Sequence, residues 1–210
     1  DQGTLTLNGA RVSGNTTRGE GGGIFIDTGQ TATVRGSTVS GNGSDAGGGI
    51  AGLLGSTLTL TDSTVSNNTA NGGGGIAAVG SATITNSTVS NNTAYAAGGG
   101  AYVDGTTWSV TSSKVFGNTA GDRGGGIYDN ATPLSLTNSR VSSNTASGDG
   151  GGVFNNSATV TLTSSSVSGN ASADGGGIFN SGSVALKTSA VSANTPNNCA
   201  PPGSVPGCTG

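Results

Sequence analysis

Hydrophobic and polar residues alternate along the chain in short segments that return at a regular interval. The segments TLTL at 4–7, TATV at 31–34 and TVTL at 159–162 place every second side chain on the same side. Strict alternation with many β-branched residues predicts a β-strand, and these segments lack the period of 3.6 residues that is typical of a helix. The apolar positions of these strands are therefore candidates for the core.

A valine follows each alternating segment, and an asparagine stands three residues after each valine. Successive valines are 24 to 27 residues apart, and every copy obeys this VxxN rule. The eight asparagines are Asn15, Asn42, Asn68, Asn92, Asn118, Asn144, Asn170 and Asn194. In the first seven copies a glycine block follows, usually with an aliphatic and often an aromatic residue, as in GGGIF at 21–25 and GGGVF at 150–154. The chain is thus an internal repeat.

Each repeat has room for about three short strands, and none of them can bury its apolar side within its own repeat. Stacking the repeats as coils solves this, because equivalent strands then pair in parallel about 4.8 Å apart and like residues form columns. One predicted inward column is Leu7, Val34, Leu60, Ile84, Val110, Leu136, Leu162 and Leu186. We predict an all-β chain with a single right-handed parallel β-helix (β-solenoid) of about eight coils, with three short strands per coil. The helix spans residues 1–195, and a C-terminal Cys/Pro cap spans residues 196–210.

The polar and glycine-rich parts of the repeat have structural explanations. Stacked asparagine amides can hydrogen-bond from coil to coil and support a tight turn. The glycines supply positive φ angles and let neighbouring coils approach closely. Trp108 falls in a column otherwise held by Leu, Val or Ala, beside Ala82, and a large residue next to a small one suits a close-packed interior.

Composition and charge narrow the choice of partners. The chain has 42 glycines and only 8% charged residues, a mixture that without the repeat would indicate disorder. The net charge is −3 and the seven cations are scattered, so we expect no nucleic-acid partner. No apolar run approaches the roughly 18 residues of a membrane span, so we expect no membrane insertion.

The two ends of the chain favour secretion. The first residue is Asp1 rather than Met, which indicates a mature form whose leader was removed, with a trimmed chain as the alternative. Cys199 and Cys208 are close enough to form a disulfide, which would require an oxidising compartment; two free thiols are the alternative. We expect a secreted protein that is extracellular or on the cell surface.

The valine–asparagine motif and the glycine block together carry a family resemblance. VxxN followed by two glycines, Gly or Ala, Ile or Val, and Phe or Tyr resembles the repeats of polymorphic outer-membrane proteins of the chlamydial type, whose motifs are FxxN and GGAI. The chain is also similar to the wider class of secreted bacterial β-helix repeat proteins. The resemblance covers Thr4 to Asn194. It implies a bacterial right-handed β-helix that acts as a surface adhesin and self-associates.

Acidic residues precede several of the glycine blocks. Asp122, Asp149 and Asp174 do so in copies five, six and seven, and Glu20 and Asp45 do so in copies one and two. Carboxylates stacked at coil spacing would repel one another, and a bound Ca²⁺ could bridge them. We expect that no cofactor is required, and that the three aspartates are possible ligands of a calcium ion. The alternative is that they are solvated turn residues.

Five of the eight aromatic residues share one position of the repeat. They are Phe25, Tyr102, Tyr128, Phe154 and Phe179. Each follows the aliphatic residue after the glycine block, so if the aliphatic side chain points inward, the ring points outward. Such a column could stack on sugars of surface glycans or on a partner chain, or it could stack on itself and stiffen one face.

Threonine recurs at the outward positions of the alternating strand. The predicted face comprises Thr4, Thr6, Thr31, Thr33, Thr57, Thr59, Thr83, Thr159 and Thr161. Ser81, Thr107 and Ser109 continue the pattern, whereas Pro133 and Ala185 interrupt it. Flat TxT arrays on β-solenoids resemble those of ice-binding proteins, in which regularly spaced hydroxyl and methyl groups order water. The strand propensity of threonine is the alternative explanation.

We expect a protein that is not an enzyme. Parallel β-helices include polysaccharide lyases and glycoside hydrolases, whose sites need paired carboxylates or acidic residues beside a basic one. Here Asp62 is the only carboxylate near the threonine face, and the chain has no histidine. The leading prediction is an extracellular structural or adhesion protein that self-associates head to tail, because no capping helix precedes the first strand. Ice binding is the first alternative, and a carbohydrate-binding or carbohydrate-active protein is the second.

Overall fold

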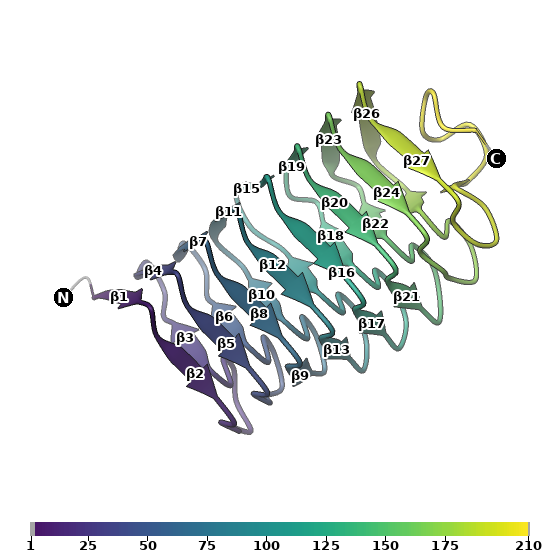
Figure 1. Ribbon diagram of the computed structural model, residues 1–210. Helices are drawn as coiled ribbons and strands as arrows, with labels where there is room; N and C mark the ends of the chain where they lie inside the picture. Colours follow the sequence, from purple (N-terminus) through teal and green to yellow (C-terminus); the bar gives the residue numbers. More distant parts are fainter. Residues whose placement is uncertain (1–2, 210) are drawn as a thin grey trace.

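The chain folds into one elongated stack of coils, with its first and last coils at opposite ends of the stack (Figure 1). The computed structural model describes residues 3–209, so Asp1, on which the expectation of a removed leader rests, lies outside the described residues. The described range contains the strands β1 to β28 and no helix, and hence no helix able to span a membrane. This architecture is the predicted parallel β-solenoid.

The strands form three eight-stranded parallel sheets and one shorter sheet. The first sheet contains β1 (Thr4–Asn8), β4 (Thr31–Arg35), β7 (Thr57–Thr61), β11 (Ser81–Thr85), β15 (Trp108–Thr111), β19 (Leu134–Thr137), β23 (Thr159–Thr163) and β26 (Ser183–Lys187). The second contains β2 (Arg11–Ser13), β5 (Thr38–Ser40), β8 (Thr64–Ser66), β12 (Thr88–Ser90), β16 (Lys114–Phe116), β20 (Arg140–Ser142), β24 (Ser166–Ser168) and β27 (Ala190–Ser192). The third contains β3 (Ile24–Ile26), β6 (Ile50–Gly52), β10 (Ile76–Ala78), β14 (Ala101–Val103), β18 (Ile127–Asn130), β22 (Val153–Asn156), β25 (Ile178–Asn180) and β28 (Cys199–Ala200). Coils are numbered by their strand in the first sheet, so coil three begins with β7.

A fourth, four-stranded sheet departs from the prediction of three strands per coil. It consists of β9 (Thr69–Ala70), β13 (Thr93–Ala94), β17 (Thr119–Ala120) and β21 (Thr145–Ala146). Isolated parallel bridges continue it toward both ends of the stack. These two-residue strands follow the asparagine turn directly, and two residues are too few for alternation to reveal them.

The core is built from columns of like residues held in exact register. Strand pairing aligns Leu7 with Val34, and the same column continues to Leu186 as predicted. The VxxN valines form a second inward column. Trp108 pairs with Ala82 and is almost fully buried. Because each coil buries its apolar side only against its neighbours, the core is continuous along the stack.

The eight asparagines of the VxxN motif lie in one column. The side-chain Nδ2 of each donates to the Oδ1 of the asparagine in the following coil, at 2.9–3.0 Å. From Asn42 onward, Nδ2 also donates to a valine carbonyl of the preceding coil. Asn194 ends the column by donating to Asn198 Oδ1 at 3.1 Å. The column closes the turn after the second sheet with satisfied buried amides.

A second polar column, of serines, lines the corner between the first and second sheets. It comprises Ser37, Ser63, Ser87, Ser113, Ser139, Ser165 and Ser189. The backbone N–H of each serine donates to the hydroxyl of the next, at 3.0–3.2 Å. This corner always has two residues between strands, as at 62–63 and 86–87, and the first adopts positive φ. The corner between the third and first sheets varies from two residues at 79–80 to four at 53–56.

The glycine block is required by the close approach of coils. Gly124 adopts a φ of +65°, and a Cβ on Gly125 would lie 2.5 Å from the carbonyl oxygen of Gly151. Other side chains would therefore force the coils apart at this position.

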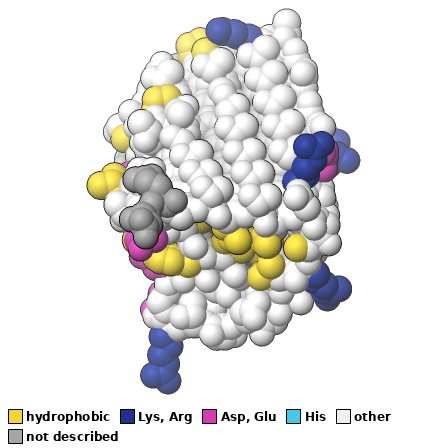
Figure 2. Space-filling model, turned by 90° about the vertical axis from the view of Figure 1, so that its left-hand side faces the viewer, with side chains coloured by type: hydrophobic (Ala, Val, Ile, Leu, Met, Phe, Trp, Pro, Cys, Tyr) yellow, Lys and Arg dark blue, Asp and Glu magenta, His cyan; other side chains and the backbone are white. Residues whose placement is uncertain are grey.

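The two ends of the stack differ. At the C-terminal end, β28 adds to the third sheet within the segment predicted as a cap, Cys199 and Cys208 form the predicted disulfide, and Val205 is buried against the core. At the other end, Leu5 in the first coil is 39% exposed. Figure 2 shows hydrophobic side chains gathered at that end, below the rows of the first sheet.

Candidate functional site

The outward surface of the first sheet, called here the threonine face, carries three parallel columns of side chains. Column one is Thr4, Thr31, Thr57, Ser81, Thr107, Pro133, Thr159 and Ser183. Column two is Thr6, Thr33, Thr59, Thr83, Ser109, Ser135, Thr161 and Ala185. The structure brings all nine predicted threonines together in these two columns.

Column three was not predicted. It is Asn8, Arg35, Thr61, Thr85, Thr111, Thr137, Thr163 and Lys187. Its residues end the strands of the first sheet, one position beyond the inward column of aliphatic residues. The alternation continues to them in TLTLT at 57–61 and TVTLT at 159–163, so extending the pattern by one step would have found the column.

The geometry of the threonine face is set by the backbone. Neighbouring side chains in a column are about 4.8 Å apart, and adjacent columns are separated by two residues of extended chain, roughly 6.6–6.8 Å. Within the described residues, the hydroxyls of Thr59, Thr85 and Thr111 have no hydrogen-bond partner in the protein. The Ser135 hydroxyl, by contrast, donates to the Trp108 carbonyl at 3.5 Å. The face therefore offers a fixed array of hydroxyl groups, with a methyl group beside each threonine hydroxyl, to whatever lies outside it.

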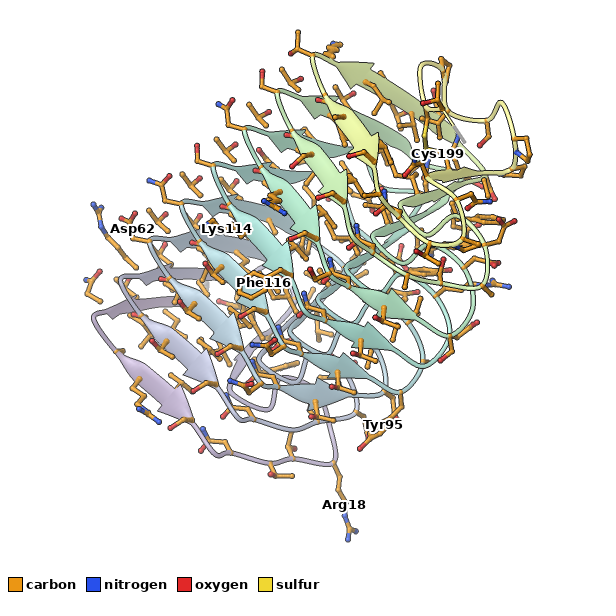
Figure 3. The ribbon with its side chains drawn as sticks, turned by 45° about the vertical axis from the view of Figure 1, so that its right-hand side comes forward. Arg18, Asp62, Tyr95, Lys114, Phe116 and Cys199 are labelled. Carbon is orange, nitrogen blue, oxygen red and sulfur yellow. A yellow bond between two sulfur atoms is a disulfide. The ribbon has the colours of Figure 1, made fainter. Side chains whose placement is uncertain are left out.

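Charge is nearly absent from this face. Arg35 and Lys187 are the two charged side chains in the three columns, and they stand in the second and the eighth coil of column three. Figure 2 shows the face as regular rows of uncharged side chains, with cations at its margins. The second sheet differs, because it presents Lys114 and Phe116 on its outer side (Figure 3).

Four of the five predicted aromatic residues form a continuous stack on the third sheet. The rings of Tyr102, Tyr128, Phe154 and Phe179 follow one another with centroids 5.0–5.2 Å apart and interplanar angles of 2–11°. Phe25 is separated from them by Ala51 and Ala77.

This stack is less exposed than predicted. Phe154 is only 4% exposed, because the flanking rings cover both of its faces. The Arg123 guanidinium also lies 5.1 Å from its ring centroid. The ring faces that a sugar would stack on are thus largely occupied by neighbouring rings.

The structure brings together two of the three aspartates proposed as calcium ligands. Asp149 and Asp174 pair in register, but the equivalent backbone bonds set Arg123 opposite Asp149, and Asp122 lies one position away opposite Gly148. Asp122 instead lies 3.8 Å from the Arg123 side chain.

The acidic column is further interrupted elsewhere. Glu20 pairs with Ala46, not with Asp45. The carboxylate of Asp174 accepts hydrogen bonds from Gly175 N and Asn197 Nδ2. Among residues 3–209, no three His, Cys, Asp or Glu side chains are grouped as a metal site.

A buried carboxyl group that sequence analysis missed lies inside the third sheet. Asp129 is fully buried on β18, in register with Asn155 and Asn180. Its Oδ1 accepts the N–H of Thr132 at 3.1 Å, and its Oδ2 has no partner in the described structure. Burial raises the pKa of Asp129 to about 7, the charge of Asp104 adds to the rise, and the Thr132 N–H opposes it.

The equivalent residue in the next coil, Asn155, shows which hydrogen bonds a side chain makes at this position. Its Nδ2 donates to Asn180 Oδ1 at 2.7 Å, and Asn180 Nδ2 donates to the Ser204 carbonyl at 2.7 Å. Each coil thus supplies a donor toward the next. Asp129 fits that role only when its carboxyl group is protonated.

The comparison with known families agrees with the fold. The family described as right handed beta helix region matches residues 22–195, so the chain belongs to the right-handed β-helix family. No curated protein and no solved structure matches the chain. Family membership establishes the fold, and function has to be argued from the surface.

Proposed function

We propose that this β-helix is a non-enzymatic, ice-binding protein that acts through the threonine face. The observation that carries the proposal is the array of outward threonine and serine hydroxyls in fixed columns on an almost uncharged sheet. A crystalline surface is itself a periodic array of oxygen atoms, so a rigid array can order water against many lattice positions at once.

Rigidity supports the proposal, because an array that flexes would pay an ordering cost on each contact. Here the backbone of the first sheet is hydrogen-bonded from coil to coil, and the serine column fixes one of its edges. The methyl group of threonine adds apolar surface beside each hydroxyl. Such surface favours contact with a solid partner over free water.

A structural or adhesive role with self-association is the second candidate. It is favoured by the first coil, where Leu5 is exposed and an open hollow of about 300 Å³ is lined by Leu5, Phe25 and Ala32. Apolar surface of this kind fits the end of another stack. Carbohydrate binding by the aromatic stack has less support, because the rings cover one another.

We further propose that the protein works outside the cell, either secreted or at the cell surface. The disulfide between Cys199 and Cys208 supports this location, since such bonds persist in oxidising compartments.

Thermal hysteresis of the purified chain tests the proposed function. We expect wild-type protein to depress the freezing point below the melting point. Thr83→Tyr, at the centre of column two, should lose most of this activity because a bulky ring lifts the face from the ice. Thr88→Tyr lies in the same coil on the second sheet and should keep it. Absence of hysteresis, together with a sedimentation coefficient that rises with protein concentration, would overturn ice binding in favour of self-association.

A further inference from the structure

We infer that the ice-contacting surface is formed by columns two and three over coils three to seven, not by the TxT pair of columns one and two. This inference rests on the proposed function and assigns its contact residues. The surface comprises Thr59, Thr61, Thr83, Thr85, Ser109, Thr111, Ser135, Thr137, Thr161 and Thr163.

Continuity of the hydroxyl array is the first argument. All ten positions of columns two and three in these coils carry a hydroxyl group. Column one is interrupted in coil six, where Pro133 stands in place of a threonine or serine. A gap in the middle of an array divides it into two shorter ones, whereas columns two and three remain unbroken for five coils.

The limits of the strands supply the second argument. β15 begins at Trp108 and β19 begins at Leu134, so Thr107 and Pro133 precede the strands to which the rest of column one belongs. Column three has no such break, because Thr111 and Thr137 are the last residues of those same strands. Column three therefore lies within paired strands throughout the central coils, whereas in coils five and six the residues of column one lie just before the strands and are joined to the ladder through the Thr107 and Pro133 carbonyls.

The corners of the coil supply the third argument. Column three adjoins the two-residue corner that the serine column holds, in which Ser113 Oγ also donates to the Thr111 carbonyl at 2.7 Å. Column one adjoins the corner whose length changes from coil to coil, between two and four residues. Exposure follows this difference. Thr61, Thr85, Thr111, Thr137 and Thr163 are all half-buried, while in column one Ser81 is half-buried and Thr57, Thr107, Pro133 and Thr159 are exposed.

The charged residues of the face mark the ends of the surface. Arg35 occupies column three in coil two, and Lys187 occupies it in coil eight, next to Ala185 in column two. A charged side chain binds its own hydration shell and stands above neighbouring threonines, so it would hold a flat solid away. The uninterrupted surface therefore begins after Arg35 and ends before Lys187.

A matched pair of substitutions in one coil tests the inference. Thr111→Tyr places a ring in column three, and Thr107→Tyr places the same ring in column one of the same coil. We measure thermal hysteresis and capture of the protein into slowly grown ice, with circular dichroism and the melting temperature as checks of folding. Thr111→Tyr should lose most of both activities, and Thr107→Tyr should keep most of both. Thr111→Ala repeats the test without added bulk and should weaken both activities while leaving the fold intact.

The outcomes separate the inference from the proposed function. If the wild type is active and the two tyrosine variants lose activity equally, ice binding stands and the assignment to columns two and three is overturned. The same holds if Thr107→Tyr is the more damaging variant. If the wild type neither shows hysteresis nor enters ice, the proposed function itself fails, and the inference fails with it.

Discussion

The asparagine column and column three of the threonine face are both repetitive, yet the fold uses them in opposite ways. Asn118 is fully buried, and each of its side-chain polar atoms is hydrogen-bonded to a neighbouring coil. Thr111 points outward, and its hydroxyl has no partner among the described residues. The repetition of asparagine is therefore required by the structure, whereas the solenoid would stand without the hydroxyls of column three.

A residue type that recurs because the fold needs it can thus be distinguished from one that recurs without a structural role and is a candidate for binding a partner. Strand propensity favours threonine on an exposed strand but does not require the same residue in coil after coil. The outward positions of the second sheet are mostly threonine and serine, yet they also admit Lys114, Arg140 and Phe116 in the central coils. Column three carries threonine without exception from coil three to coil seven, although the second sheet shows that the fold tolerates charged and aromatic residues on such a surface.

The largest effect is expected when one asparagine side chain is removed from the middle of the asparagine column. Asn118→Ala removes the acceptor of Asn92 N and Asn92 Nδ2, and it leaves Asn144 Oδ1 without that donor. Each buried group left unpaired costs roughly 1–3 kcal/mol, so we expect the free energy of unfolding to fall by about 4 kcal/mol. Urea denaturation followed by circular dichroism measures this loss.

The first asparagine of the column is the matched control. Asn15 is exposed, and its side chain only donates, to Asn42 Oδ1. Asn15→Ala should therefore cost about 1 kcal/mol. Equal losses for the two variants would mean that the column does not carry the stability assigned to it.

The buried carboxyl group of Asp129 makes the stability of the fold depend on pH. Its pKa in the folded protein is about 7, above the ordinary value of 3.8, so the folded state binds the proton more tightly than the unfolded chain. The resulting stabilisation is fully present below pH 3.8 and is lost as the pH rises through about 7, at roughly 1.4 kcal/mol per pH unit within that window.

Asp129→Asn should remove this pH dependence, since its amide can donate at any pH as Asn155 does. Chemical denaturation of both proteins at several pH values between 4 and 8 checks the expected slope. Asp62→Asn, on an exposed turn, serves as the control and should leave the slope in place. A wild-type stability that stays level or rises across this range would contradict a protonated Asp129.

The smallest expected effects come from two hydroxyls that lie two residues apart. Ser87 Oγ accepts the Ser63 N–H at 3.1 Å and donates to the Thr85 carbonyl at 2.7 Å, whereas the Thr85 hydroxyl has no partner in the described structure. Ser87→Ala should lower the free energy of unfolding by about 1–2 kcal/mol, and Thr85→Val should change it by less than about 0.5 kcal/mol. Thermal denaturation of both variants checks the ranking, which a larger loss for Thr85→Val would reverse.

The fold could be predicted because the same pattern of residues recurs in eight successive repeats. Alternation located the strands of the first sheet, and the constant offset of three residues in VxxN fixed the register of the second. The serine column escaped prediction, because serine is abundant along the chain and a serine that stabilises a corner looks like any surface residue. The strands of the fourth sheet are too short for a pattern.

The functional surfaces were harder to predict because they depend on exact register. Asp122 and Asp149 both precede a glycine block, but Arg123 occupies the position in its copy that Asp149 holds in the next, so Asp122 lies one position earlier and falls in a different column. Asp129 was overlooked although alternation after Ile127 and Tyr128 places it inward, because a carboxyl group is rarely buried in a core. The extent of the aromatic column followed from the repeat, and stacking of the rings on one another was one of the two interpretations; the spacing alone could not decide between them, because the outcome depends on ring orientation.

The asparagine column has a direction, and this has a consequence for how such a protein grows. The bonds between the asparagine side chains of this column all run from donor to acceptor toward the C-terminus, and Asn198 receives the last of these bonds. The asparagine of a duplicated repeat inserted anywhere in the column would therefore donate to the asparagine on its C-terminal side and accept from the one on its N-terminal side. Asn198 would still accept the last bond of the column. The length of the outward surface is thus set by the number of repeats. Each duplicated repeat lengthens the surface by about 4.8 Å and leaves the packing of the core unchanged.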